Sequence, residues 1–376
     1  MAFHSFEPPE RLLLGPGPSP VPPRVLAALA RPTIGHLDPR FIAMMDEIKE
    51  LLRYAFRTRN ALTLPVSAPG SAGMETAFVN VVEPGDTVVV CRNGVFGARM
   101  RENVVRLGAT AVVVDDAFGR PVDLDKVESA LRAHPGAKAL AFVHAETSTG
   151  ALSDARALCR LAREHGALSI VDAVTSLGGV DVDVDGWGAD AIYSGSQKCL
   201  SAPPGLAPVS FGERAIAALK ARRTPVTSWF LDLGLVMNYW QGEGARAYHH
   251  TAPINMLYAL HEALLMLREE GLEAAWARHR ENHLRLRRGL EALGLELFVE
   301  ESARLPQLNA VRVPDGVDEA AVRRRLLDEH GIEIGAGLGE LAGRIWRIGL
   351  MGAGSTPQNV DRVLGALGES LQRKAA

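Results

Sequence analysis

Six short apolar runs recur along the first half of the chain, and most of them are separated by segments with helical character. The runs are continuously apolar rather than alternating, which is typical of strands that are covered on both faces. Helical segments between such strands imply crossover connections in a mainly parallel sheet. The sequence therefore predicts an α/β fold with helices on both faces of a central sheet. The predicted strands are residues 61–64, 87–91, 110–114, 139–143, 168–171 and 189–193.

The pattern changes in the last third of the chain. Charged helical segments at residues 272–293 and 318–330 alternate with short apolar stretches, which suggests a smaller α+β domain. The proline-rich residues 8–23 are read as an extended arm. The predicted organisation is an N-terminal arm, a large domain and a small C-terminal domain, at residues 1–20, 21–265 and 266–376.

Composition limits the classes of function. A formal net charge of -3 over 376 residues argues against nucleic-acid binding, because there is no broad basic excess to displace counterions. Cys91, Cys159 and Cys199 are too few and too scattered for a disulfide framework or a zinc site. The chain has no export signal and no window of about eighteen apolar residues. We expect a cytoplasmic protein that binds neither nucleic acid nor a membrane and holds no metal.

Two polar residues follow predicted strands, at the sheet edge where parallel sheets bind ligands. Asp172 ends the apolar run that starts at Leu168, and Lys198 follows the run that ends at Tyr193. Pyridoxal 5′-phosphate needs such a pair, because its aldehyde forms a Schiff base with a lysine and its pyridine nitrogen stays protonated beside a carboxylate. Small residues at 194–196 leave room for a bulky group. Taken singly, Lys198 would be read as a surface lysine and Asp172 as a helix cap.

A series of ordered motifs extends this interpretation to nearly the whole chain. With them, the sequence resembles the class V, fold-type I aminotransferases, and within that class most resembles the alanine–glyoxylate aminotransferases. The motifs are Gly15-Pro-Gly-Pro18, Asp46-Glu-Ile-Lys49, Glu83-Pro-Gly-Asp86, Glu146-Thr-Ser-Thr-Gly150, Val171-Asp172, Ser176-Leu-Gly-Gly179, Tyr193 to Lys198, Ala202 to Gly205, Tyr248-His-His-Thr251 and Arg347-Ile-Gly349.

The resemblance implies an activity and an assembly. The cofactor would be pyridoxal 5′-phosphate, and Lys198 and Asp172 would be the catalytic residues. A small amino acid, alanine foremost, would give its amino group to glyoxylate by a ping-pong aldimine mechanism, which yields glycine and a 2-oxo acid. The resemblance also implies a homodimer in which Tyr248 and Thr251 reach the phosphate at the other subunit's site.

The resemblance further assigns residues that hold the cofactor and the substrate. Gly70 and Ser71 match phosphate contacts in a loop that opens a helix, where free backbone N–H groups and the helix dipole favour an anion. Pro69 departs from the family pattern, because it offers neither an N–H nor a hydroxyl group. The remaining matched positions are Phe96 and Val174 on the two faces of the pyridine ring, Thr147 beside the 3′-oxygen, Gln197 at the phosphate, and Arg347 and Gly17 at the substrate.

Several of these residues have a structural alternative. Phe96 could be an ordinary core residue, and the segment Glu146-Thr-Ser could be a helix cap. Arg347 could form a structural ion pair instead of binding a carboxylate bidentately. His249 and His250 are interpreted as packing or interface residues. The glycine-rich residues 335–339 are interpreted as a turn rather than as a nucleotide loop.

Other functions fit the sequence to different degrees. A cysteine desulfurase needs a thiol on a later loop, and no cysteine follows Cys199. Ureidoglycine-specific relatives typically carry Gln and Asn where this chain has His36 and Tyr248. Serine–glyoxylate transamination stays open because one hydroxyl group is poorly rejected by a loose pocket. From a different class, the fold alone would also suit a cofactor-free or nucleotide-binding α/β protein.

Overall fold

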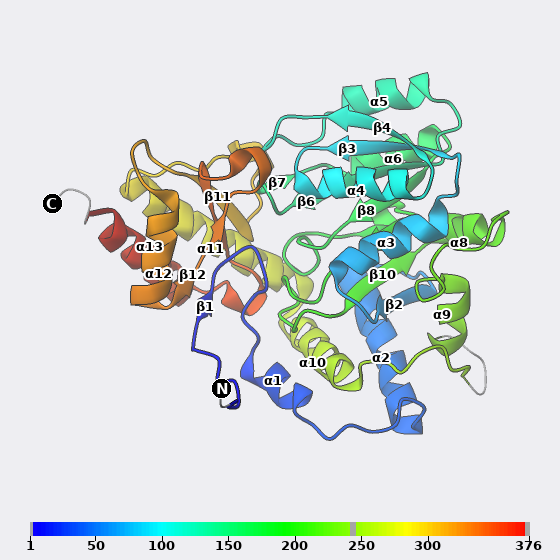
Figure 1. Cartoon of the computed structure of the whole chain (residues 1–376), viewed down its shortest axis with the longest axis horizontal. Coiled ribbons are helices and arrows are strands. Elements are labelled where there is room, and N and C mark those ends of the chain that lie inside the picture. The colour runs from blue at the N-terminus through cyan, green and yellow to red at the C-terminus, as the bar shows by residue number, and fades with distance from the viewer. Residues whose placement is uncertain (1–2, 241–245, 373–376) are drawn as a thin grey trace.

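The computed structural model describes residues 3–240 and 246–372, and its centre is a seven-stranded sheet (Figure 1). The strands follow the order β2-β10-β9-β8-β5-β3-β4 across the sheet. Their bounds are β2 Leu62–Val66, β3 Thr87–Arg92, β4 Thr110–Asp115, β5 Ala139–Val143, β8 Leu168–Asp172, β9 Ala191–Tyr193 and β10 Ala207–Phe211.

The direction of these strands confirms the prediction of a mainly parallel sheet. Strands β4, β3, β5, β8 and β9 pair in parallel, whereas β10 pairs antiparallel with both β9 and β2. Because β2 and β9 both oppose β10, β2 runs in the same direction as the parallel strands. The carboxyl ends of six strands therefore lie along one edge of the sheet, where ligands of such sheets bind.

Helices cover both faces of the sheet, with α3 and α4 in front of it in Figure 1. Helix α3 contacts β9 and β10, α4 contacts β3, β4 and β5, and α6 contacts β5 and β8. The helices of this part are α1 Pro23–Leu29, α2 Pro39–Phe56, α3 Gly70–Val81, α4 Val95–Arg106, α5 Leu124–Ala133, α6 Ala155–Glu164, α7 Val184–Trp187, α8 Glu213–Lys220, α9 Leu233–Trp240 and α10 Ile254–Glu270; a hairpin of β6 Ala145–Glu146 and β7 Ala151–Leu152 follows β5.

A second, smaller apolar cluster forms around an antiparallel sheet of order β11-β14-β13. The larger cluster extends to Ala275 within α11, and the smaller one begins at Leu286 on the same helix. The predicted division at residue 265 stays a prediction. The elements here are α11 Leu272–Ala292, β11 Leu308–Arg312, α12 Glu319–His330, β12 Ile332–Glu333, β13 Gly335–Ala336, β14 Ile345–Gly349 and α13 Pro357–Gln372, with 3-10 turns at Glu301–Ala303, Gly339–Leu341 and Gly352–Gly354.

The N-terminal segment joins this smaller unit. Strand β1, Leu12–Leu13, pairs in parallel with β12, and Leu14 is fully buried in the smaller apolar cluster. Figure 1 shows the blue start of the chain running up against the orange helices. The segment read as an extended arm is therefore, in part, a strand of the C-terminal unit.

Three local predictions need correction. Strand β4 is partly exposed along most of its length, because it is the edge strand of the sheet and only one neighbour flanks it. Strand β10 was not predicted, because Pro208 and Ser210 interrupt its apolar run. The glycine-rich segment predicted as a turn starts with strand β13, where Gly335 pairs opposite Arg347 of β14.

Two further observations concern the surface and the thiols. Within the described residues, no helix is both long and apolar enough to cross a membrane. Cys91, Cys159 and Cys199 are buried and unpaired.

Candidate active site

The catalytic lysine predicted from the sequence follows β9 at the carboxyl edge of the sheet. Lys198 is 8% exposed, and its Nζ donates a hydrogen bond to the carbonyl oxygen of Pro16. Burial, together with the nearby charge of Arg347, lowers the pKa of Lys198 to about 8. Gly17 has φ +103°, and a Cβ atom there would lie 2.6 Å from Nζ. The N-terminal segment thus packs against the amine, and Gly17 lets it approach closely.

Asp172 ends the neighbouring strand β8 and is almost completely buried. Its Oδ1 accepts a hydrogen bond from the backbone N–H of Val174 at 2.8 Å, and its Oδ2 accepts one from the hydroxyl of Tyr193 at 2.8 Å. Burial raises the pKa of Asp172 to about 7, although these two hydrogen bonds and the charge of Lys198 favour the carboxylate. A cationic ring nitrogen at this carboxylate would favour ionisation further.

A cradle of small residues lies beside these two groups. A Cβ atom on Gly70 would lie 3.4 Å from Val174 and 3.5 Å from the Cα of Gly195, so these three residues are direct neighbours. Gln197 lies against Gly195, and its Oε1 is buried without a hydrogen-bond partner among the described residues. An orphaned buried acceptor marks a place where a ligand or water completes the bonding.

The predicted phosphate loop begins a helix as expected. Helix α3 starts at Gly70, and its N-cap position is Pro69, which provides no side-chain cap. The first N–H groups of a helix need acceptors from outside the helix, and an anion satisfies them well. The lysine, the carboxylate, the glycine cradle and this helix start together fit pyridoxal 5′-phosphate.

Arg347, on β14 of the smaller unit, lies near enough to Lys198 for its charge to affect the lysine. Its Nη1 donates to the carbonyl oxygen of Thr147 at 3.1 Å, and its Nε donates to that of Ala336 at 2.7 Å. Burial lowers the pKa of Arg347 to about 10, and the buried carboxylate of Glu146 opposes this change. The guanidinium bonds backbone carbonyls rather than a carboxylate, so the structural ion pair considered as an alternative is absent among the described contacts.

Thr147 and Phe96 are fixed by their neighbours. The Thr147 hydroxyl is hydrogen-bonded to the hydroxyl of Thr175, three residues beyond Asp172. Phe96 lies in the first turn of α4, and the guanidinium of Arg99 covers one face of its ring, 4.8 Å from the centroid. One face of Phe96 is therefore covered by a cation, and we expect the other to be used by a ligand.

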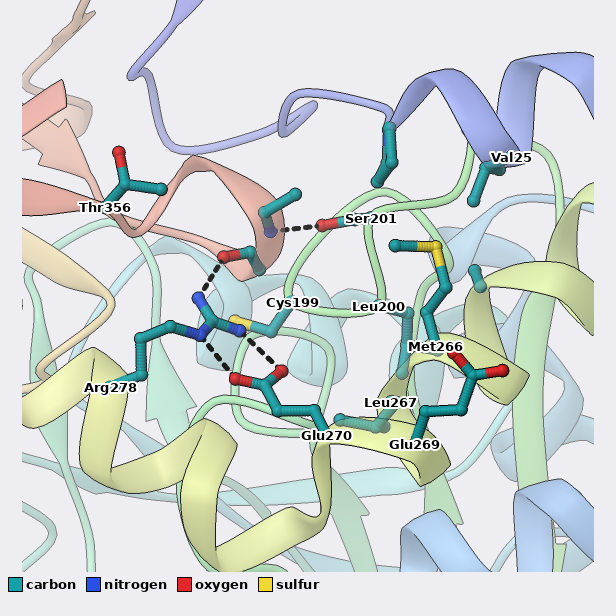
Figure 2. A pocket seen from close by; sticks show the side chains of 14 residues that line it. Val25, Cys199, Leu200, Ser201, Met266, Leu267, Glu269, Glu270, Arg278 and Thr356 are labelled. Atoms are coloured by element: carbon teal, nitrogen blue, oxygen red, sulfur yellow. Dashed lines mark hydrogen bonds and ion pairs between the residues drawn. The ribbon is translucent and has the colours of Figure 1, made fainter. Parts of the chain in front are cut away.

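The turn after Lys198 is tied to the smaller unit. Ser201 adopts φ +54°, in the left-handed region, and its Oγ accepts a hydrogen bond from the backbone N–H of Ala353 at 2.8 Å. Figure 2 shows this bond beside a pocket of about 510 Å³, in which Arg278 forms an ion pair with Glu270. Cys199 and Ser201 line this pocket, so it lies next to the lysine turn, and it does not include Asp172 or Arg347.

Within the described chain, Tyr248 contacts Thr251 and His36 rather than Lys198 or Asp172. Tyr248 is 63% exposed, its hydroxyl lies 3.5 Å from that of Thr251, and its ring lies 5.3 Å from the ring of His36. The histidines between them pack as predicted: His249 stacks on Trp229 with ring centroids 4.4 Å apart. His250 is hydrogen-bonded to Ser67, just before the phosphate loop, at 2.7 Å.

The sequence did not reveal two residues that belong to the site. Tyr193 was read as part of an apolar strand, although the register places it opposite Asp172. Glu146 was quoted within a family motif and as a possible helix cap, without a role in the site, and it is fully buried close enough to Asp172 and Arg347 to influence the pKa of both. A buried acidic residue in an apolar stretch is the signal that could have found it.

Comparison with known proteins identifies the family of this chain. The model of the family described as aminotransferase class-V matches residues 11–354. An alanine–glyoxylate aminotransferase of Oryctolagus cuniculus is 44% identical, over 98% of this chain and 94% of its own. The solved structure of an alanine–glyoxylate aminotransferase from Nostoc sp. is 49% identical with a TM-score of 0.96, covering 99% of this chain and 98% of its own.

A third relative has a different named donor. The solved structure of a ureidoglycine–glyoxylate aminotransferase from Bacillus subtilis is 39% identical with a TM-score of 0.96, and covers 99% of this chain and 96% of its own. All three relatives align over nearly their full length. This chain therefore belongs to the class V aminotransferases, the fold-type I enzymes that use pyridoxal 5′-phosphate.

Proposed function

We propose that this protein transfers the amino group of a small amino acid, with alanine as the main donor, to glyoxylate, giving glycine and a 2-oxo acid. The observation that carries the proposal is the convergence of Lys198, Asp172 and Arg347 at one edge of the sheet, where each influences the ionisation of another. The two relatives above that are 44% and 49% identical are both named alanine–glyoxylate aminotransferases.

The roles follow from the chemistry of each side chain. Bound pyridoxal 5′-phosphate carries the amino group and acts as an electron sink. Asp172 would hold the pyridine nitrogen, Gly70, Ser71 and Gln197 the phosphate, and Thr147 the 3′-oxygen. Phe96 and Val174 would enclose the ring.

Lys198 and Arg347 would act on the substrate. The lowered pKa of the Lys198 amine, about 8, leaves a larger neutral fraction near neutral pH than an exposed lysine has, and the neutral amine can move the proton at the substrate Cα. Arg347 would bind the substrate carboxylate bidentately, and Gly17 would contact the substrate beside the lysine amine, against which its backbone packs. The two substrates would use this one site in turn, which gives ping-pong kinetics.

Serine and ureidoglycine are the alternative donors. The rings of His36 and Tyr248 pack together at the positions where ureidoglycine-specific relatives typically carry amides. This aromatic pair favours a donor with a small apolar side chain. The test is a panel in which purified enzyme receives alanine, serine or ureidoglycine with either glyoxylate or pyruvate as acceptor. Alanine with glyoxylate should give the highest kcat/KM, and failure of glyoxylate with every donor would refute the proposal.

Arg347→Lys should raise the amino acid concentration needed for half-saturation by roughly 10- to 100-fold, because an ammonium group cannot reproduce a bidentate, charge-assisted pair. Glyoxylate should be affected similarly, since its carboxylate would use the same guanidinium. Steady-state kinetics with both substrates measures the effect. Arg344→Lys, at an exposed position before the same strand, is the matched control. Unchanged saturation by both substrates would show that Arg347 has a structural role.

We also propose that two copies form a dimer that completes each site. Tyr248 and Trp229 are 63% and 62% exposed, and Phe230, at 37%, packs against His250 beside them. A cluster of exposed aromatic rings marks a surface that another protein covers. A second copy related by a twofold axis would place Tyr248 and Thr251 near the phosphate of the opposite site.

The predicted cytoplasmic location is supported by the unpaired cysteines, and cell fractionation would test it.

Mixed dimers test the shared site. Co-expression of Lys198→Ala with the double variant Tyr248→Phe and Thr251→Val should restore activity, because one site of each mixed dimer receives both defects and the other receives none. If all contacts were made within one chain, every site would keep a defect. Purified mixed dimers would be compared with each parent, after the double variant alone has been shown to be impaired. Mixed dimers no more active than their parents would contradict the proposal.

A further inference from the structure

Helix α4, which carries Phe96, lacks a capping side chain of its own. Its N-cap position is Gly94, and no side-chain cap comes from that residue. Helices usually begin with Ser, Thr, Asp or Asn, whose oxygen accepts a hydrogen bond from an N–H group of the first turn. Since the first N–H groups have no partner inside the helix, acceptors must come from elsewhere.

The acceptors come from the segment after β5, about fifty residues later in the sequence. Ser148 Oγ accepts a hydrogen bond from the backbone N–H of Val95 at 3.0 Å, and Glu146 Oε2 accepts one from the N–H of Phe96 at 3.3 Å. The two capping groups are also joined, because Ser148 donates to Glu146 Oε1 from its Oγ at 2.6 Å and from its backbone N–H at 3.0 Å. Both side chains are completely buried.

The glycine at the start of the helix is required by this arrangement. A Cβ atom on Gly94 would overlap the carboxyl group of Glu146 and would lie 2.6 Å from Ser148 Oγ. The backbone of Gly94 is extended, so its conformation would suit other residues. Space for the two capping groups is therefore the reason for glycine here.

The charge of Glu146 also affects Arg347. Burial raises the pKa of Glu146, while its hydrogen bonds from Ser148 and from the α4 backbone favour the carboxylate. The positive end of the helix dipole favours it as well. Arg347 Nη1 donates to the carbonyl oxygen of Thr147, the residue between the two capping groups, at 3.1 Å, so a negative charge on Glu146 also favours the buried guanidinium. Glu146 is thus coupled both to the helix that presents Phe96 and to the substrate-binding cation.

We propose that Glu146 and Ser148 are positioning residues. Together they fix the first turn of α4, so that Phe96 holds its ring against the cofactor. The carboxylate of Glu146 also helps to hold the guanidinium of Arg347, which donates to the carbonyl oxygen of the neighbouring Thr147, in place for the substrate carboxylate. This inference rests on the proposed function, because that function assigns Phe96 and Arg347 their roles. The two roles differ in their response to mutation, since Ser148→Ala weakens the cap but leaves the carboxyl group of Glu146 in place, whereas Glu146→Gln removes the charge.

The experiment compares Glu146→Gln and Ser148→Ala with a control that removes a cap elsewhere. Asp318→Ala is the matched control, because Asp318 caps α12 of the smaller unit by accepting from the N–H of Ala321 at 3.0 Å. Cofactor-free protein of each variant is titrated with pyridoxal 5′-phosphate to obtain Kd. The visible circular dichroism of the bound cofactor and the Tm are also measured. Half-saturation by the amino acid is then measured on the loaded enzyme.

Both site variants should bind the cofactor about tenfold more weakly, the size expected for one lost cap, and should show a reduced dichroism band. Asp318→Ala should lower Tm and leave Kd and the band unchanged. Glu146→Gln should further raise the half-saturating amino acid concentration, and Ser148→Ala, which keeps the carboxyl group, should raise it less.

Each part of the proposal can fail separately. Wild-type Kd and dichroism in Ser148→Ala and Glu146→Gln would overturn the role at Phe96. Unchanged half-saturation in Glu146→Gln would overturn the role at Arg347. Because Ser148→Ala removes a single oxygen atom, it keeps the first test decisive even if Glu146→Gln destabilises the fold. A wild-type protein that binds no pyridoxal 5′-phosphate would instead contradict the proposed function itself.

Discussion

A Lys198→Ala protein is expected to fold and to bind pyridoxal 5′-phosphate, but to turn over at least about 10³-fold more slowly than the wild type, in the range of a lost general acid–base group. The lysine amine is buried against Pro16 and Gly17, and its pKa is lowered to about 8, so it is placed and tuned to move a proton. A methyl group can neither bond the cofactor nor carry that proton. The fold should persist, because the amine makes its described hydrogen bond to one backbone carbonyl only.

The measurement is multiple turnover of alanine and glyoxylate, with cofactor binding followed by absorbance. Lys220→Ala, which removes an exposed lysine at the end of α8, is the control and should keep wild-type activity. Sustained turnover by Lys198→Ala at a wild-type-like rate, without added amine, would exclude the catalytic role.

For Asp172→Asn, the proton-transfer step should slow by about 10²- to 10³-fold, the size of a lost electrostatic group in a buried site. Asparagine keeps an oxygen that can accept the hydrogen bond from Val174, so the local backbone is preserved. It cannot carry the negative charge that would keep the pyridine nitrogen protonated. The defect should therefore be seen in the rate of the alanine half-reaction under single-turnover conditions, with the cofactor still bound.

A buried carboxylate at the other end of the same strands provides the control. Asp190 precedes β9 and is hydrogen-bonded to Ser169 and to Arg214, far along the strands from Asp172. Asp190→Asn should lower stability while leaving the half-reaction of the folded protein near normal. If Asp172→Asn reacts at the wild-type rate, its charge has no role in the chemistry.

The central sheet could be predicted because its signals are local. Continuous apolar runs mark β3, β5, β8 and β9, and the ends of the last two place Asp172 and Lys198 on the same edge. No longer-range information was needed for this part, because parallel strands joined by crossover helices end at the same side.

The rest of the site depends on pairings that no local pattern encodes. Tyr193 meets Asp172 only because β9 pairs with β8 in one register, and a shift of one residue would turn its side chain to the other face. Glu146 caps a helix that begins fifty residues earlier in the chain. The hydrogen bond from Lys198 to the carbonyl oxygen of Pro16 joins two residues that are 182 positions apart in the sequence. The contacts proposed for Tyr248 and Thr251 would involve another chain, so a sequence can indicate them through resemblance alone.

The pairing of β1 with β12 has a consequence for how the protein is made. Leu12 is synthesised 320 residues before its partner Ile332. The larger apolar cluster ends at Ala275 and can assemble during translation, whereas Leu14 must wait for Leu326 and Leu367 before its cluster closes. The smaller unit therefore closes after the larger cluster. Because Gly17 lies in the early segment and Arg347 in the late one, the lysine pocket is finished only after the segment that contains Arg347 has been synthesised.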